Sequence, residues 1–300
     1  MTGRATRRCV AAFLLAAAWP AAAQQAAPPP DAGEGNCLTS GCHANLAEGA
    51  VVHMPVEDEA CDLCHTPRAT GHAFDTPDPI GETCLGCHDD PAGGMTGHVH
   101  GPVAAGRCTG CHDPHRSDRG KLLRADSPEL CWRCHGRVQT WEGRRPVRNV
   151  KEEIETAELP HGAVDAGCDT CHPPHASDYG RLVTDAFPDG PYARGAEGSY
   201  ALCFACHDET MLEEGADTGF RNEQKNLHRV HVAREKSRSC ALCHSPHGGA
   251  AHLIRSRAPF GQWDLPIDYE PLADGGRCAV ACHEQREYHR GGAETAAGGS

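Results

Sequence analysis

The longest apolar run of the chain lies near its N-terminus. Val10 to Trp19 follows three arginines and precedes Ala21-Ala22-Ala23. A basic start, a short apolar stretch and a small-residue cleavage site are typical of a secretory signal peptide. The run is shorter than the roughly 20 residues of a membrane-spanning helix. We therefore predict that residues 1–23 are a removable Sec-type signal peptide and that no transmembrane segment remains after cleavage; Arg7-Arg8 leaves twin-arginine export as an alternative.

The rest of the chain shows little regular patterning. Residues 24–36 are rich in Ala and Pro and are expected to be a flexible leader. The clearest helix is predicted over 149–159, ending before Pro160, with its acidic faces in solvent. No segment shows the sustained alternation of a strand. With Gly/Pro-rich stretches such as 185–198 and a frayed tail over 291–300, the pattern predicts a coil-rich chain with short α-helices and little or no sheet.

Composition shows that such a chain lacks an ordinary core. The 300 residues hold 19 Cys and 21 His against 6 Phe, 5 Tyr and 4 Trp. So few large apolar side chains would struggle to offset the entropy of ordering a chain of this length. The formal charge of −13, from 41 acidic and 28 basic residues, argues against a nucleic-acid partner, because phosphates are neutralised by clustered Lys and Arg. Something other than side chains must fill the core.

The cysteines carry the regular pattern that the apolar residues lack. Cys9 lies within the signal peptide, and the other 18 form nine pairs, each followed directly by His. Seven pairs have the spacing C-x-x-C-H: Cys61, Cys64, His65; Cys84, Cys87, His88; Cys108, Cys111, His112; Cys131, Cys134, His135; Cys168, Cys171, His172; Cys203, Cys206, His207; and Cys240, Cys243, His244. Two are wider: Cys37, Cys42, His43 and Cys278, Cys282, His283.

A cysteine pair followed by His is the attachment signal of c-type haem. Two thiols one helical turn apart can add to the vinyl groups on one edge of the porphyrin, and the next residue can bind the iron as proximal ligand. Disulfide frameworks and zinc sites are the alternatives for a cysteine-rich secreted chain. Neither needs His after the second Cys, and His is only 21 of the 300 residues. We predict nine covalently attached haems c, the two wider motifs included because a longer loop can still reach both vinyl groups.

The histidines outside the motifs recur as well. One stands seven to nine residues upstream of an attachment site in each of four blocks: His53, His100, His161 and His231. Another follows the site in a Pro-His dipeptide in three blocks: His115, His175 and His247. In the first block Arg68 holds that position, and His72 is the expected substitute.

This recurrence divides the chain into units. A leading single-haem segment over 37–50 precedes two-haem units at 51–97, 98–158, 159–227 and 228–290. Two extra histidines in each unit would supply the distal ligands of its two haems. The ninth haem would take its distal ligand from among His98, His228, His252 and His289.

The stretch HGPVAAGRCTGCHDPHRSDRGKLLRADSPELCWRCH, from His100 to His135, resembles the doubled-CXXCH family of multihaem cytochromes c, and CDTCHPPHASDYGRLV repeats the pattern. The resemblance extends over nearly all of 51–285 and is loosest in the first and last units. It implies a multihaem cytochrome c with a core formed by covalently bound haems, closely packed and bis-histidine ligated. Methionine is a poor rival ligand, because only Met54, Met95 and Met211 survive cleavage.

Two main functions are in view, beside the lesser alternative of a haem-bearing sensor or structural filament. The first is an electron carrier, periplasmic or exported to the cell surface, which passes electrons between redox proteins such as other cytochromes, a quinol oxidase or an outer-membrane porin-cytochrome complex. The second is a reductase or oxidase of a small nitrogen or sulfur compound, which would need one iron with an open coordination site. The sequence marks no such site and no catalytic residue, so we expect a carrier rather than an enzyme. The acidic charge favours a partner with a basic patch, although acidity also serves solubility.

Overall fold

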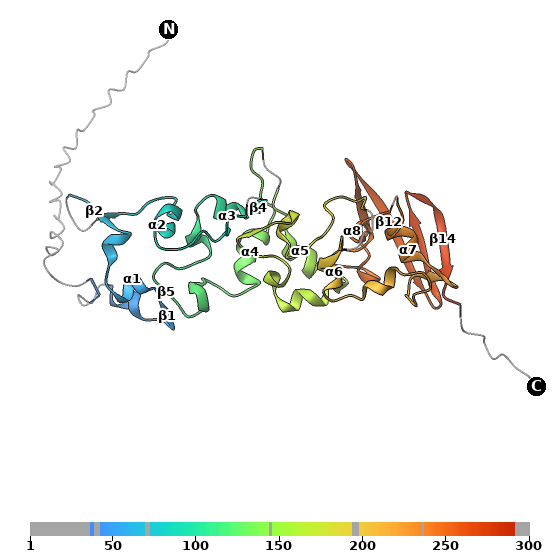
Figure 1. The fold of residues 1–300 in the computed structure, drawn as a ribbon, viewed down its shortest axis with the longest axis horizontal. Coiled ribbons are helices and arrows are strands. Elements are labelled where there is room, and N and C mark those ends of the chain that lie inside the picture. The colour runs from blue at the N-terminus through green and yellow to red at the C-terminus, as the bar shows by residue number, and fades with distance from the viewer. Residues whose placement is uncertain are drawn as a thin grey trace, which may run out of the picture.

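The computed structural model describes residues 37–38, 43–69, 73–95, 97–143, 146–193, 198–235 and 237–291. The predicted signal peptide and leader lie outside the described residues, as do Cys42, His72 and residues 292–300. The described chain forms one elongated body in which sequence order is also spatial order: the first unit lies at one end and the last at the other (Figure 1).

Helices are short throughout, because Gly and Pro interrupt the chain every few residues. The α-helices are α1 Met54–Glu57, α2 Gly81–Leu85, α3 Gly101–Ala104, α4 Glu129–His135, α5 Val150–Glu155, α6 Ala201–Phe204, α7 Leu227–Val232 and α8 Cys240–Cys243. The 3₁₀ turns are η1 Ala44–Ala47, η2 Cys61–Leu63, η3 Cys108–Gly110, η4 Gly120–Leu122, η5 Gly162–Ala166, η6 Cys168–Thr170, η7 Gly180–Leu182, η8 Glu209–Leu212 and η9 Ala251–Leu253.

The helix predicted over 149–159 is present but shorter. Asn149 caps α5 by accepting a hydrogen bond from the backbone N–H of Glu152 at 3.2 Å. The helix ends at Glu155, and Leu159–Pro160 forms a short strand instead, paired with Gly248–Gly249. Pairing with this distant segment therefore accounts for the end of α5 at Glu155, four residues before the predicted end at residue 159.

Strands are more abundant than predicted. A four-stranded antiparallel sheet forms the C-terminal end, and ten two-residue strands pair elsewhere in the described chain. The short strands are β1 Val51–Val52, β2 Thr66–Pro67, β3 Phe74–Asp75, β4 His98–Val99, β5 Arg116–Ser117, β6 Leu159–Pro160, β7 Ala176–Ser177, β8 Arg221–Asn222, β9 Lys225–Asn226 and β10 Gly248–Gly249. The strands of the C-terminal sheet are β11 Arg257–Phe260, β12 Trp263–Leu272, β13 Gly275–Val280 and β14 His283–His289. The expectation of little or no sheet was wrong for this end of the molecule.

The sheet has a signal in the sequence that two prolines obscure. Leu265, Ile267 and Tyr269 are partly or fully buried, whereas Asp264, Pro266 and Asp268, which alternate with them, are exposed. This is strand alternation of period two. Pro266 and Pro271 interrupt the same run and lower any strand expectation from sequence alone. Ile267 instead packs with Leu242 and Ala258 in a small buried cluster.

Three of the two-stranded ladders join successive units. β1 of the first unit pairs with β5 of the second, β4 of the second with β7 of the third, and β6 of the third with β10 of the fourth. Each ladder places the segment around an upstream histidine against the segment that follows a Pro-His dipeptide. We call these three pairs the inter-unit ladders.

Side chains alone form only a sparse core. The buried hydrophobic residues among those described are small or scattered, and Tyr200 is the one large side chain with less than 2% of its surface exposed. None of the described helices is long and apolar enough to cross a membrane. The elements instead surround the cysteine-histidine motifs.

Candidate metal centres

The seven C-x-x-C-H motifs share one local geometry. In six of them the backbone N–H of the motif His donates to the carbonyl of the first Cys, four residues earlier, at 2.9–3.0 Å. The seventh motif lies within α4. One helical turn therefore separates the first thiol from the imidazole. The spacing of the motif thus places both thiols and the histidine close together, around the space that one bound group would occupy.

The last motif is built differently. Cys278 lies in β13 and His283 in β14, with Cys282 in the turn between them. The register shifts between Cys278 and Val280, which marks a bulge where the spacer has its extra residue. The three-residue spacer thus belongs to a β-hairpin rather than to a helical turn.

Motif histidines face histidines from outside the motifs. In the described part of the chain, seven such pairs have ring centres 6.0–6.4 Å apart and planes inclined by 6–38°. The pairs are His53–His88, His65–His115, His100–His135, His112–His175, His161–His207, His172–His247 and His228–His244.

The pairing follows a rule that differs from the one expected. Each upstream histidine faces the second motif of its own unit, as His100 faces His135. Each Pro-His histidine instead faces the first motif of the preceding unit, as His175 faces His112. The reason is reach: three residues span about 10 Å at most, so the Pro-His histidine cannot pass round a porphyrin that its own motif holds. Every joint between units therefore completes a pair.

The same joint orients the upstream histidine. The Nδ1 atoms of His53, His100 and His161 lie 2.8–2.9 Å from the carbonyl oxygens of Pro114, Pro174 and Pro246, the prolines of the next unit's Pro-His dipeptides. A carbonyl oxygen can only accept, so Nδ1 carries the proton and Nε2 keeps its lone pair. The Pro-His dipeptide therefore positions one histidine and supplies another.

First-motif histidines are held by a loop that sequence reasoning had not identified. His112, His172 and His244 donate Nδ1–H to the carbonyls of Lys121, Leu182 and His252 at 2.7–2.9 Å. These acceptors lie in η4, η7 and η9, each with two consecutive residues at φ of 53–62°. Non-glycine residues seldom adopt this conformation. The recurring sequences GKL, GRL and AHL, which begin seven or eight residues after the histidine, are the signal for the loop.

The fourth unit departs from the rule, because its first motif faces a histidine of the same unit. His228 and His231, one turn apart on α7, replace the single upstream histidine. The ring centres of His228 and His244 are 6.4 Å apart. Of the four histidines that we considered as distal ligand of the ninth haem, His228 is therefore the one that faces a motif histidine. His231 donates Nδ1–H to the carbonyl of Leu227 at 2.8 Å, and the pKa of its imidazole is lowered by burial and then by a nearby charge on His283. It lies on the side of the ninth motif.

The remaining candidates lie elsewhere. His98 is an exposed residue of β4. His252 presents its carbonyl to His244 and its ring to the edge of Tyr269, 6.0 Å away. His289 is 58% exposed at the end of β14. His43 precedes η1, while its neighbour Cys42 and the expected substitute His72 lie outside the described residues.

The buried imidazoles are held neutral, which is the form that binds a metal. Burial lowers the pKa of His115, His135, His175 and His244. For His228, burial followed by the neighbouring His244 and His231 lowers the pKa to about 4. Its Nδ1 is buried without a hydrogen-bond partner.

Thiols of successive motifs lie beside one another in chain order. Burial and then the thiol of the next motif raise the pKa of Cys84 to about 11 and that of Cys131 to about 12. Electrostatic interactions link every motif to the next: Cys37 with Cys61, Cys64 with Cys84, Cys84 with Cys108, Cys111 with Cys134, Cys131 with Cys168, Cys171 with Cys206, Cys203 with Cys240, and Cys243 with Cys278. The nine motifs form one linear series.

The spacing of the paired rings fits an iron between them. An imidazole nitrogen binds a metal at about 2.0–2.1 Å, and with the nitrogen about 1.1 Å from the ring centre, two opposed ligands have centres about 6.3 Å apart. The observed 6.0–6.4 Å agrees with this value. The two thiols of each motif would attach the porphyrin covalently, and the paired imidazoles would bind its iron.

The doubled CXXCH motif is recognised in three segments, residues 53–93, 100–140 and 161–212. Each begins at an upstream histidine and contains two attachment motifs. The fourth unit, with its two histidines on α7 and its hairpin motif, lies outside these matches. No curated protein matches the chain.

Proposed function

Because residues 53–93, 100–140 and 161–212 belong to the doubled CXXCH family and the chain is a multihaem c-type cytochrome, we propose that it is a nine-haem electron carrier. Its haems would be bis-histidine ligated and arranged in sequence order. The observation that carries the proposal is the set of seven opposed histidine pairs, because each would fill both axial positions of one iron.

A bound haem supplies a one-electron Fe(III)/Fe(II) couple. The protein's own residues then fix which iron chemistry is possible. Two axial imidazoles leave no coordination position for a substrate, and a second histidine stabilises a low potential relative to methionine. The linear order of motifs gives electrons a path from one end of the molecule to the other. Electron transfer therefore fits the arrangement better than reduction of a small molecule.

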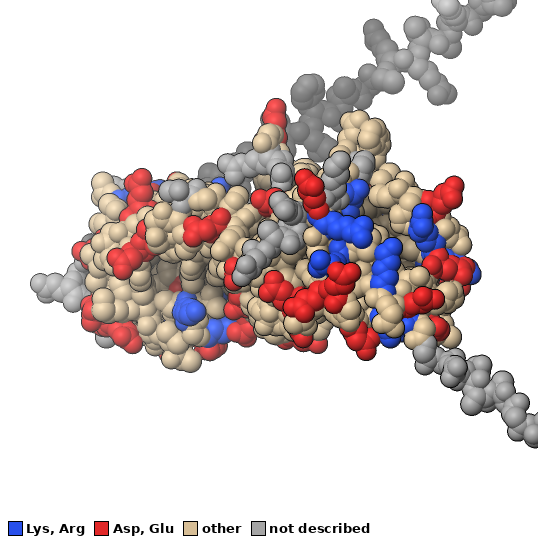
Figure 2. Space-filling model, turned by 45° about the vertical axis from the view of Figure 1, so that its right-hand side comes forward, with Lys and Arg blue, Asp and Glu red and all other residues tan. Residues whose placement is uncertain are grey.

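The charge distribution suggests how partners dock. Residues 37–97 hold 10 acidic and 1 basic residues, whereas residues 228–290 hold 7 acidic and 9 basic residues. In Figure 2 the Lys and Arg side chains gather toward the end that carries the C-terminus. A partner with a basic patch would be steered to the first unit, and the encounter would weaken with salt. Such partners are other cytochromes, a quinol oxidase or an outer-membrane porin-cytochrome complex, met in the periplasm or at the cell surface.

The proposal is tested on the mature protein purified from a host that matures c-type cytochromes. Intact-mass measurement should show nine added haem masses, and the EPR spectrum of the oxidised protein should show low-spin ferric iron only. Fewer than nine haems would overturn the count. A high-spin ferric signal that shifts on adding nitrite or sulfite would overturn the carrier function in favour of a reductase.

A further inference from the structure

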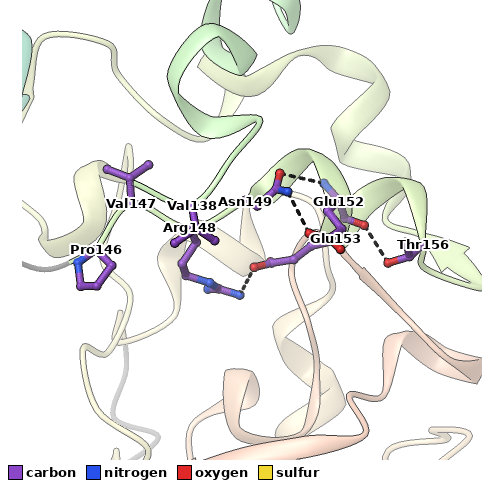
Figure 3. Close-up of a pocket in the computed structure, with 8 residues that line it drawn as sticks. All are labelled: Val138, Pro146, Val147, Arg148, Asn149, Glu152, Glu153 and Thr156. Atoms are coloured by element: carbon purple, nitrogen blue, oxygen red, sulfur yellow. Dashed lines mark hydrogen bonds and ion pairs between the residues drawn. The ribbon is translucent and has the colours of Figure 1, made fainter. Parts of the chain in front are cut away.

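Glu153 of α5 lies between three units of the chain. In Figure 3 its carboxylate faces the Arg148 side chain across the hollow beside α5, while Asn149 and Glu152 interact with each other. Its Oε1 lies 2.5 Å from the Arg148 guanidinium, and its Oε2 lies 3.5 Å from Nδ1 of His247. The Glu153 side chain is 28% exposed and that of Arg148 68%. The carboxylate therefore interacts with an exposed, solvated cation and with a more protected imidazole.

His247 is the Pro-His histidine of the fourth unit and faces His172, the motif histidine of the Cys168–Cys171 site. If Nε2 of His247 binds that iron, Nδ1 is free to donate its proton to Oε2 of Glu153. A carboxylate that accepts this proton makes an axial imidazole a stronger electron donor. A stronger donor stabilises ferric over ferrous iron and lowers the reduction potential.

The three Pro-His histidines differ in this contact. Nδ1 of His115 lies 3.8 Å from Oδ1 of Asp113, which also accepts two backbone N–H groups and so has less capacity left for the ring. In the third unit Pro173 occupies the position that corresponds to Asp113. No carboxylate among the described residues forms an ion pair with the ring of His175. The same ligand position thus occurs with a close carboxylate, a more distant one and none.

We propose that Glu153 is a positioning residue that lowers the reduction potential of the haem at Cys168–Cys171 through the Nδ1 proton of His247, and that Arg148 opposes this effect by competing for the carboxylate. The inference rests on the proposed function, because it requires a haem between His172 and His247. The half-reaction takes up one electron per iron; no covalent bond forms or breaks, and the proton stays between Nδ1 and Oε2.

The test is a mediated potentiometric titration of the full-length mature cytochrome, followed by absorbance and by the paramagnetically shifted haem methyl signals. Glu153→Gln should move one ninth of the absorbance change to higher potential, with about a tenfold higher ratio of reduced to oxidised iron at fixed potential, or about 59 mV for one electron. Arg148→Gln should move the same fraction to lower potential. A purely structural contact would shift both variants in one direction.

Two further variants complete the design. Glu152→Gln, one residue away on α5 and bonded to Asn149 rather than to a histidine, should titrate as the wild type. Pro173→Asp adds a carboxylate at the position of Asp113 and should lower the potential of the haem at Cys108–Cys111, which His175 would ligate. Superimposable titrations of Glu153→Gln and wild type, or an equal shift in Glu152→Gln, would overturn the inference. If the variants in such a result still hold nine low-spin haems, the carrier proposal stands and only the role of Glu153 is refuted. If haems are missing from the wild-type protein, the carrier proposal is refuted.

Discussion

At the scale of single residues, the Pro-His dipeptide does two things for a neighbouring unit. The carbonyl of Pro174 accepts Nδ1–H of His100 at 2.9 Å, and the imidazole of His175 faces His112. Both contacts cross a unit boundary, and the backbone N–H of His100 donates to the carbonyl of His175 at 2.8 Å in the same joint. The pair of His112 and His175 therefore forms only when the two units dock.

The cross-unit pairing predicts which iron loses its ligand when a Pro-His histidine is removed. His175→Ala should produce one high-spin ferric haem, detected by EPR, at the Cys108–Cys111 site. The triple variant His175→Ala, Cys108→Ala, Cys111→Ala should then show no high-spin signal, because the iron that His175 would ligate is absent.

The matched comparison uses the other site. His175→Ala combined with Cys168→Ala and Cys171→Ala should keep the high-spin signal. A signal that persists without the Cys108–Cys111 haem and disappears without the Cys168–Cys171 haem would instead show that each unit supplies its own ligands.

At the scale of elements, the fourth unit and the C-terminal sheet differ from the three units before them. α7 supplies two histidines where the other units supply one, and the hairpin of β13 and β14 holds the last motif. In the sheet, Tyr288 lies opposite Gly276 and its hydroxyl is 3.2 Å from that of Tyr269. The aromatic ring occupies the space over the glycine, a known way of fixing register between strands.

This packing predicts that Gly276→Ala destabilises the sheet. A Cβ at Gly276 would lie 2.7 Å from the Tyr288 hydroxyl and 2.8 Å from the Tyr269 ring, so the strands must shift at a cost of about 1–3 kcal/mol. Limited proteolysis followed by mass spectrometry should show cleavage within 257–289 that is about tenfold faster.

Gly219→Ala is the control, because no atom lies within 4 Å of a Cβ built there. It should be cleaved at the wild-type rate. Equal rates for Gly276→Ala and wild type would mean that the two tyrosines do not fix the register of the sheet.

The sequence could predict those interactions that join residues close together in the chain, but not those that join distant segments. The motif turns are local, since the His112 N–H reaches only to the Cys108 carbonyl four residues earlier, and the spacing alone predicted them. The partner of His112 lies 63 residues away, and its identity depends on how units dock, so the pattern gave candidates but not the pairing. The C-terminal sheet was missed because its prolines hide the alternation of Leu265, Ile267 and Tyr269.

At the scale of the whole molecule, the units stack as a linear array in which each contacts its neighbours. The inter-unit ladders set the direction of the array, and electrostatic interactions between thiols link the motifs in order from Cys37 to Cys278. This arrangement follows sequence order, and each of the first three units needs the next one to complete a histidine pair. A linear series has no parallel path, so each internal haem would lie on the only short route between the ends.

The last prediction follows from that geometry. Cys131→Ala combined with Cys134→Ala removes the fifth attachment site, whose thiols interact electrostatically with those of the fourth and sixth. Electron transfer slows steeply as the gap between centres widens, so the current through single molecules tethered by tags at their two termini should fall by orders of magnitude, although eight haems remain. His98→Ala, outside the observed histidine pairs, should carry the wild-type current. An undiminished current in the double cysteine variant would mean that electrons bypass the fifth site, and the haems would then form a branched cluster rather than a series.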